Sequence, residues 1–321
     1  MIYNAYMKIH FLSFYSGVVD RGVEVSTAAL ASRLSKEHDI AVFQTGPRLI
    51  QSSPTIVITT TVQMNRSSGD HSFLRRIYMD YYSRAISIFT LSWISYFLKD
   101  KPDVVIPTNG GWQVVICRIL TWIFGKKMIV QGNAGIGWDD LWSLWCSPDY
   151  FIAISPQGFN WARRKAPWIR IRYIPHGVDI DEMNAAVAQK VPLKKPIVLC
   201  VAALVPLKRI DLLIRAMVGI PHASLLVIGR GYLKAELEKL GKKLLGDRFL
   251  LLDTVTRDAL PPFYKAATLF SLPSSSTEAL GFVQIEAMAA NVPVVATDDE
   301  NRRKIIGDAG IWLTQQIPVH T

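Results

Sequence analysis

Short apolar runs alternate with amphipathic stretches along most of the chain. The first run, residues 7–15, predicts a strand, and residues 22–36 follow it with apolar side chains at helical spacing. Further strands are predicted from the apolar runs at residues 40–45, 56–60, 103–107, 127–131, 150–155 and 171–175. Because buried parallel strands are typically continuous apolar runs, this alternation predicts a doubly wound parallel sheet.

The alternation starts again in the second half of the chain. Residues 197–202 predict a strand and residues 209–218 a helix. This second series continues with apolar runs at residues 225–228, 249–252, 269–272, 293–297 and 311–313. A polar, lysine-containing segment, residues 181–196, separates the two series. We therefore expect two Rossmann-like α/β domains, at 1–180 and 197–321, joined by a linker at 181–196 and facing a cleft, where such proteins bind ligands.

The composition of the chain is that of a globular protein. Of its 321 residues, 50% are hydrophobic and 19% are charged, so the chain can bury a sizeable core and is not globally disordered. The three cysteines, Cys117, Cys146 and Cys200, are far apart and form no CxxC pair. This excludes a disulfide scaffold and favours a reducing, cytosolic setting. The polar N-terminus also lacks the basic and apolar regions of a secretory signal.

The net charge of +10 leaves three classes of anionic partner open, namely nucleic acid, membrane lipid and small molecules. Residues 85–98 carry no charge, but 14 residues are too few for a bilayer-spanning helix, which needs about 20. Eight of the nine tryptophans lie between residues 93 and 168, and the run 161–172 holds five basic residues and no acidic one. Apolar surface combined with Trp and Lys or Arg can mark a helix that lies on an anionic membrane. An ordinary aromatic core with a solvated basic helix end is the alternative, and no nucleic-acid-binding motif is found.

The segment with the most chemical information is residues 274–296, which read SSSTEALGFVQIEAMAANVPVVA. It runs from a predicted strand through a loop into a helix, with Glu278 in the loop, Gly281 at the helix start and Glu286 inside the helix. A helix N-terminus can hold a phosphate, and a glycine there lets the backbone approach the ligand. A carboxylate can accept hydrogen bonds from sugar hydroxyls. By spacing alone, two glutamates eight residues apart would equally fit a solvated helix face.

The full pattern E-A-L-G-F-x-x-x-E-A-M-A-x-x-x-P-V-V-A closely resembles the E-x7-E signature of the retaining glycosyltransferases of family 4, also called glycosyl transferases group 1. Members of this family are two-domain GT-B enzymes that use nucleotide-sugar donors. Three other segments resemble the same family: IPHGVDID at 174–181, with His176 where Asn is usual, VAALVPLKRIDLLIRA at 201–216, and VIGRGYLKAELEKL at 227–240. The resemblance covers most of residues 7–315 and is most specific in the second half.

The resemblance implies a role for each matched residue on the donor side. Glu278 would orient the donor sugar, and Glu286 would hold the ribose diol. Lys208, assisted by Arg209, would neutralise the diphosphate leaving group, which is electrostatic catalysis. The other donor contacts that the resemblance implies are the backbone amides of Leu280, Gly281 and Phe282 and the loop glycines Gly229 and Gly22. Basic side chains do this work in the family without a bound metal, and the chain has no clustered His/Cys set for metal ligation.

The chain departs from the family pattern in three places. Residues 202–204 lack the arginine that commonly precedes the phosphate-binding lysine, so the second cation is missing or is supplied by Arg209. The segment 130–140 lacks the family's histidine, and Gln131 or Asn133 would take a polar role near the reacting sugar. The family continues past the last strand into helices that cross back onto the first domain, whereas this sequence stops at Thr321. A shortened second domain is therefore expected.

Together these observations predict a metal-independent hexosyltransferase (EC 2.4 class) that acts in the synthesis of cell-surface polysaccharides or glycoconjugates. The second domain would hold a UDP- or GDP-type sugar, and the first would hold a saccharide or lipid-linked acceptor, with retention at the transferred sugar. We expect no separate cofactor, no nucleic-acid partner, and a cytoplasmic location with peripheral contact to an anionic membrane. Two alternatives stay open. One is a GT-B nucleotide-sugar epimerase, which the Glu278/Glu286 pattern disfavours, and the other is a catalytically weak binding subunit, which the three departures favour.

Overall fold

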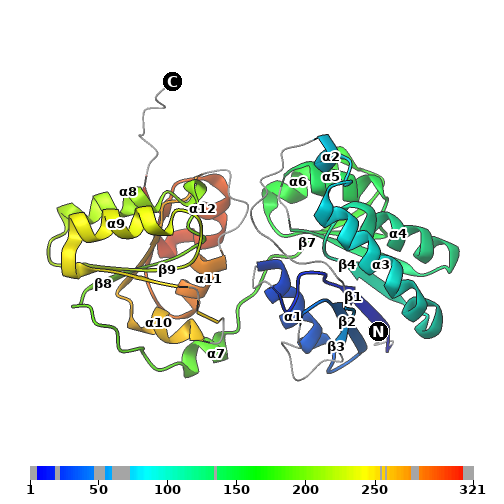
Figure 1. Cartoon of the computed structure of the whole chain (residues 1–321), viewed down its shortest axis with the longest axis horizontal. Helices are drawn as coiled ribbons and strands as arrows, with labels where there is room; N and C mark the ends of the chain where they lie inside the picture. Colours follow the sequence, from blue (N-terminus) through cyan, green and yellow to red (C-terminus); the bar gives the residue numbers. More distant parts are fainter. Residues whose placement is uncertain are drawn as a thin grey trace. The chain divides into compact units, whose positions relative to one another are not determined.

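The chain folds into two compact units, shown in the computed structural model of Figure 1. The structure describes residues 6–18, 22–46, 55–59, 73–133, 136–253, 255–256, 259–275 and 282–313. The first unit spans Met1–Pro175 and the second His176–Thr321. Part of the segment expected to be a linker is the helix α7 (Ile180–Ala185), which packs on α11 (Phe282–Ala289). The second unit begins at His176, before residue 181. Met183 of α7 is buried in its core.

The first unit is built on a seven-stranded sheet in which every strand pair is parallel. Its strand order is β3-β2-β1-β4-β5-β6-β7. The strands are β1 (Lys8–Leu12), β2 (Asp39–Gln44), β3 (Thr55–Val57), β4 (Val104–Pro107), β5 (Lys127–Gly132), β6 (Tyr150–Ala153) and β7 (Arg170–Tyr173). Each apolar run that the sequence analysis interpreted as a strand in this half overlaps one of them. The doubly wound parallel sheet is thus confirmed for the first unit.

Helices cover both faces of the first sheet. They are α1 (Gly22–Leu34), α2 (Phe73–Arg76), α3 (Tyr81–Asp100), α4 (Gly111–Ile123), α5 (Trp138–Trp145) and α6 (Pro156–Lys165). A small apolar cluster joins α1 to one face through Ala31, Ile9 and Phe11. A larger cluster joins α3, α4, α5 and α6 to the other face. The uncharged run 85–98 lies within α3, and no helix in the described part of the chain is both long and apolar enough to cross a bilayer.

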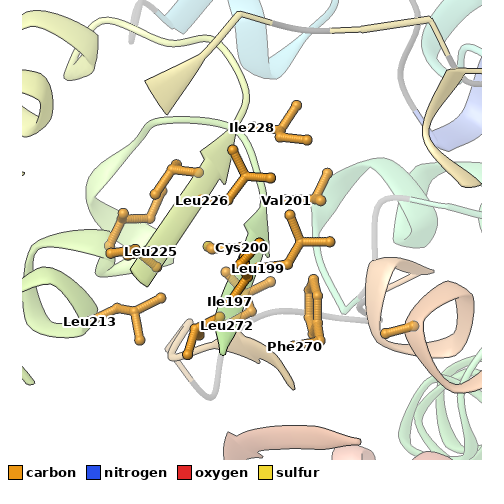
Figure 2. Packing of buried hydrophobic residues seen from close by; sticks show 14 of the residues in the cluster. Ile197, Leu199, Cys200, Val201, Leu213, Leu225, Leu226, Ile228, Phe270 and Leu272 are labelled. Carbon is orange, nitrogen blue, oxygen red and sulfur yellow. The ribbon is translucent and has the colours of Figure 1, made fainter. Parts of the chain in front are cut away.

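The second unit repeats this architecture with a six-stranded parallel sheet in the order β10-β9-β8-β11-β12-β13. Its strands are β8 (Ile197–Val201), β9 (Ser224–Ile228), β10 (Phe249–Leu252), β11 (Leu269–Leu272), β12 (Val294–Thr297) and β13 (Gly310–Leu313). Its longer helices besides α7 and α11 are α8 (Ile210–Ala216), α9 (Lys234–Leu245), α10 (Pro261–Ala266) and α12 (Glu300–Ile306). All residues of β8 and β9 are buried, as the labelled side chains in Figure 2 illustrate. Burial on both sides explains why these strands read as unbroken apolar runs.

Two glycines bring a pair of loops of the second unit into backbone contact. A Cβ added to Gly229 would lie 1.9 Å from the carbonyl oxygen of Ala202, and one added to Gly231 would lie 2.2 Å from that of Leu204. The Leu204 amide also donates a 2.9 Å hydrogen bond to the Arg230 carbonyl. Close packing of the loop after β9 against the loop after β8 therefore requires glycine at both positions.

This contact predicts that Gly229→Ala destabilises the second unit by about 1–3 kcal/mol, because the methyl group would force the two backbones apart. Gly219→Ala is the matched control, since an added Cβ there has no neighbour within 4 Å. Thermal unfolding of both variants measures the difference. Equal melting temperatures for the two variants would contradict the proposed contact.

A buried histidine links β1 to α3 in the first unit. His10 is fully buried, and its Nδ1 accepts a 3.2 Å hydrogen bond from the Trp93 indole. The Asp100 carboxylate lies 3.6 Å from the other ring nitrogen. Burial lowers the pKa of His10 to about 4, although Asp100 acts in the opposite direction. The ring is therefore neutral at neutral pH, as its acceptor role toward Trp93 requires.

The shifted pKa predicts a loss of stability on mild acidification. Between pH 6.5 and about 4, the unfolded chain protonates His10 and the folded chain does not, so the free energy of unfolding falls as the pH falls through this window. The full effect is roughly 3 kcal/mol. His10→Asn keeps an acceptor for Trp93 but does not titrate, so denaturant unfolding at pH 7 and pH 5 should show a smaller loss for this variant. The same loss in both proteins would show that His10 does not cause it.

Candidate functional site

Strand order marks one end of each sheet as a place for ligands. In the second sheet, β9 and β10 extend to one side of β8, whereas β11, β12 and β13 extend to the other. Such a reversal leaves a crevice at the carboxyl ends of the two central strands, here β8 and β11. The loop after β8 carries Lys208 and Arg209, and the loop after β11 begins the segment with the two predicted glutamates. The fold therefore brings together two motifs that are some 70 residues apart in sequence.

The Lys208 loop is bonded directly to the start of the loop after β11. Lys208 ends a short 3-10 turn, Pro206–Lys208, and its side chain is half-buried. The carbonyl of the preceding Leu207 accepts a 2.9 Å hydrogen bond from the Ser275 amide. Lys208 is thereby held near the chain segment that leads to Glu278.

The side chain of Arg209 joins the same two loops by hydrogen bonds. Its backbone has a left-handed conformation, with φ of 48°, at the point where the turn passes into α8. The guanidinium donates to the carbonyls of Pro273, at 2.7 Å, and Ser274, at 3.0 Å. Burial, followed by the nearby charge of Arg302, lowers its pKa. Arg209 therefore holds the loop in place, in addition to any contact with a phosphate.

A second arginine, not identified from the sequence, converges on this loop from α12. Arg302 is only 3% exposed and donates to the Ser274 hydroxyl at 2.7 Å and to the Ser275 carbonyl at 3.1 Å. It is also paired with Asp299, the N-cap of α12. The sequence signal was the run Asn-Arg-Arg-Lys at residues 301–304, which is separated from the end of β12 by three residues, but nothing in the pattern indicated which arginine turns inward. Arg302 therefore places a buried cation close enough to Arg209 to act on its pKa.

Glu286 is placed by a buried tyrosine. It lies in α11 and is 8% exposed, and its Oε2 accepts a 2.7 Å hydrogen bond from the Tyr264 hydroxyl on α10. Tyr264 is fully buried, so this bond fixes the carboxylate. Two residues earlier, the side-chain amide of Gln284 is buried and has no hydrogen-bond partner among the described residues. The sequence analysis identified Glu286 but neither Tyr264 nor Gln284.

His176 packs against the first residue of α11. Its ring centroid lies 4.1 Å from that of Phe282, at an interplanar angle of 48°. Burial lowers the pKa of His176 to about 4, so the ring is uncharged at neutral pH. His176 thus packs against the start of α11.

Three predicted donor residues, Glu278, Leu280 and Gly281, lie outside the described residues. The structure brings together Lys208 and Arg209 around the loop that leads to them, and it places Phe282 and Glu286 on the helix that follows. Gly229 lies in the neighbouring loop after β9 and packs on the backbone of Ala202. No described group of three or more His, Cys, Asp or Glu residues is arranged to hold a metal ion, and the metal-independent site stays a prediction.

The first unit contains a cavity of about 510 Å³ at the corresponding end of its own sheet. Residues after β1, β4 and β5 line it, and the strand order reverses between β1 and β4. Gln131 and Asn133 are both in the lining, and the buried Oδ1 of Asn133 has no partner in the described part of the chain. Gly22 starts α1 and is not a lining residue, whereas its neighbours Val23 and Glu24 are.

Acidic side chains, which the sequence analysis did not single out, dominate the charge of this cavity. Four carboxylates and one arginine line it, namely Glu24, Asp80, Asp139, Asp140 and Arg75. The Tyr78 hydroxyl donates a 2.5 Å hydrogen bond to Asp139. Burial and this bond raise the pKa of Tyr78, so the hydroxyl stays protonated. The cavity lining therefore carries more acidic than basic side chains.

The sequence of the second unit is similar to that of known glycosyltransferases. Residues 183–316 match the family model for glycosyl transferases group 1. A GDP-mannose-dependent alpha-(1-6)-phosphatidylinositol monomannoside mannosyltransferase of Mycobacterium tuberculosis is 32% identical over 148 residues, which are 40% of this chain and 38% of that protein. A D-inositol 3-phosphate glycosyltransferase of Mycolicibacterium smegmatis is 34% identical over 139 residues, 40% of this chain and 32% of that protein. The matched region is thus well under half of each relative.

Solved structures resemble nearly the whole chain. Anabaena HepE in complex with UDP and glucose has a TM-score of 0.71 at 18% identity, covering 96% of this chain and 86% of that one. Sucrose-phosphate synthase from Thermosynechococcus elongatus has a TM-score of 0.73 at 20% identity with the same coverage. At these identities the likeness shows the fold, which is the predicted GT-B arrangement of two parallel-sheet domains. The predicted resemblance is confirmed for residues 183–316, which match the family model for glycosyl transferases group 1.

Proposed function

We propose that this protein is a glycosyltransferase that moves a hexose from a UDP- or GDP-type sugar to a saccharide or lipid-linked acceptor. The observation that carries the proposal is the junction of the Lys208 loop with the loop after β11, bonded through Leu207 to Ser275 and through Arg209 to Ser274. This junction lies where strand order reverses, and Arg209 and Arg302 both donate to the segment Pro273–Ser275 that forms part of it. A nucleotide diphosphate is an anion suited to such a place.

The donor would be held by groups of the second unit. Lys208 neutralises the diphosphate and stabilises the charge that develops when the sugar leaves. Glu286, fixed by Tyr264, offers a carboxylate to the ribose hydroxyls. Glu278 orients the sugar, as the family pattern implies. UDP in the HepE structure and GDP-mannose in the name of the mycobacterial mannosyltransferase support both nucleotide types for the donor.

The acceptor would occupy the cavity of the first unit. Its lining of four carboxylates, with Gln131 and Asn133, suits sugar hydroxyls, which donate hydrogen bonds to such groups. The negative charge disfavours a phosphate inside the cavity and favours an uncharged or amino-bearing saccharide end. A lipid or phosphate portion of the acceptor would then lie outside the cavity, which agrees with the lipid-linked acceptor named for the mycobacterial relative. We further propose retention of configuration and a role in glycoconjugate synthesis on the cytoplasmic face of a membrane.

Transfer assays with radiolabelled donors test the proposal through the two central side chains. Lys208→Ala and Glu278→Ala should each lower transfer about 100- to 1000-fold, because each removes a group that meets charge or hydroxyls of the reacting donor. Lys239→Ala, on the exposed side of α9, is the matched control and should be fully active.

Normal turnover by both site variants would refute the site assignment. Donor-dependent stabilisation of the wild-type protein without any product would instead support a binding-only subunit.

A further inference from the structure

The outer face of α4 is apolar along its whole length. The exposed side chains on and directly after this helix include Trp112, Ile119, Trp122, Ile123 and Phe124. Trp122 is 77% exposed and Ile123 66% exposed. The opposite face, with Val114, Cys117 and Thr121, is buried in the first unit. Because 13 helical residues span about 20 Å, this is an extended apolar stripe and not a single exposed side chain.

Tryptophans of α5 continue the stripe at the start of α4. Trp142 packs between Trp112, at a ring distance of 6.0 Å, and Trp138, at 6.3 Å, and Trp138 also contacts Trp145 at 5.4 Å. Trp138 and Trp145 are 44% and 54% exposed. We call the set Trp112, Ile119, Trp122, Ile123, Phe124, Trp138 and Trp145 the aromatic face.

The polar atoms of three of these indoles are already bonded inside the protein. The Nε1 groups of Trp112, Trp138 and Trp142 donate to the backbone carbonyls of Ile77, Arg76 and Gly111, at distances of 2.8–3.2 Å. Their exposed ring surface is therefore apolar, and the bonds hold the rings in place. A rigid, solvent-exposed apolar surface is unfavourable in water unless something covers it.

Basic residues border the aromatic face at both ends. Arg75 and Arg76 are exposed beside the carbonyls that bind Trp112 and Trp138. Lys126 and Lys127 follow Phe124 and are paired with Asp103 and Asp149. Residues 73–173, which include this region, contain thirteen Lys and Arg against six Asp and Glu. The partner that covers the face should therefore present both apolar groups and negative charge.

We propose that the aromatic face docks the first unit onto the surface of an anionic lipid bilayer, with the rings in the boundary between headgroups and acyl chains. A bilayer of this kind offers apolar depth for Trp122, Ile123 and Ile119 and phosphate headgroups for the bordering arginines and lysines. Tryptophan is suited to that boundary. The contact is peripheral, since no described helix can span a bilayer. This inference adds a partner to the proposed function, and its test needs no transfer reaction.

Sedimentation with vesicles tests the docking surface directly. The wild-type protein should sediment with vesicles of phosphatidylcholine and phosphatidylglycerol, and less with phosphatidylcholine alone. Trp122→Glu and Ile119→Glu should each weaken binding about tenfold or more, because each loses buried apolar area and adds a negative charge. Tyr232→Glu is the matched control, since Tyr232 of the second unit is 76% exposed against 77% for Trp122, and its binding should equal the wild type. All substituted side chains are exposed, so the fold should be kept.

The proposal fails if the wild-type protein sediments with neither kind of vesicle, or equally with both. It also fails if Trp122→Glu and Ile119→Glu bind as well as Tyr232→Glu. Size-exclusion chromatography tests whether a second copy of the chain occupies the aromatic face instead. A dimer that Trp122→Glu dissociates without any change in lipid binding would assign the aromatic face to a second copy of the chain.

Discussion

The candidate donor site depends on two arginines that hold one loop. Arg209 comes from the start of α8 and Arg302 from α12, and both guanidinium groups donate to the short segment Pro273–Ser275 after β11. Two like charges this close repel each other, which is one cause of the lowered pKa of Arg209. Their carbonyl and hydroxyl partners, with Asp299 beside Arg302, offset that repulsion. The position of the segment Pro273–Ser275 is set by this balance of charge and hydrogen bonds.

The chain has no arginine at residues 202–204, before Lys208. A buried cation is supplied from α12, far away in sequence, and it is held by its own acceptor groups. Arg302 is 3% exposed, so its charge is little screened by water. An anionic donor at this end of the sheet would experience that charge together with that of Lys208. In the first unit the sign of the charge at the cavity is the opposite, because four carboxylates and one arginine line it.

The sequence predicted the sheets well because central strands such as β8 and β9 are buried on both faces and read as apolar runs. It also located Lys208, Arg209 and Glu286, since these belong to local motifs with a recognisable spacing. The sequence did not identify Arg302 or Tyr264, because each acts through a contact between segments distant in sequence. The tryptophans show the same limit. Trp93 is fully buried and Trp122 is largely exposed, although both lie in predominantly apolar helices, so composition alone could not separate core from surface.

The central claim is that the second unit binds a nucleotide-diphosphate sugar at the junction of the Lys208 loop and the loop after β11. The most direct measurement is the melting temperature of the protein with a panel of UDP- and GDP-sugars. The account predicts that at least one of them raises the melting temperature of the wild-type protein, because a ligand bound only to the folded state stabilises it. The same sugar should give little or no rise with Lys208→Ala. No rise with any member of the panel, or an equal rise in both proteins, would contradict the account.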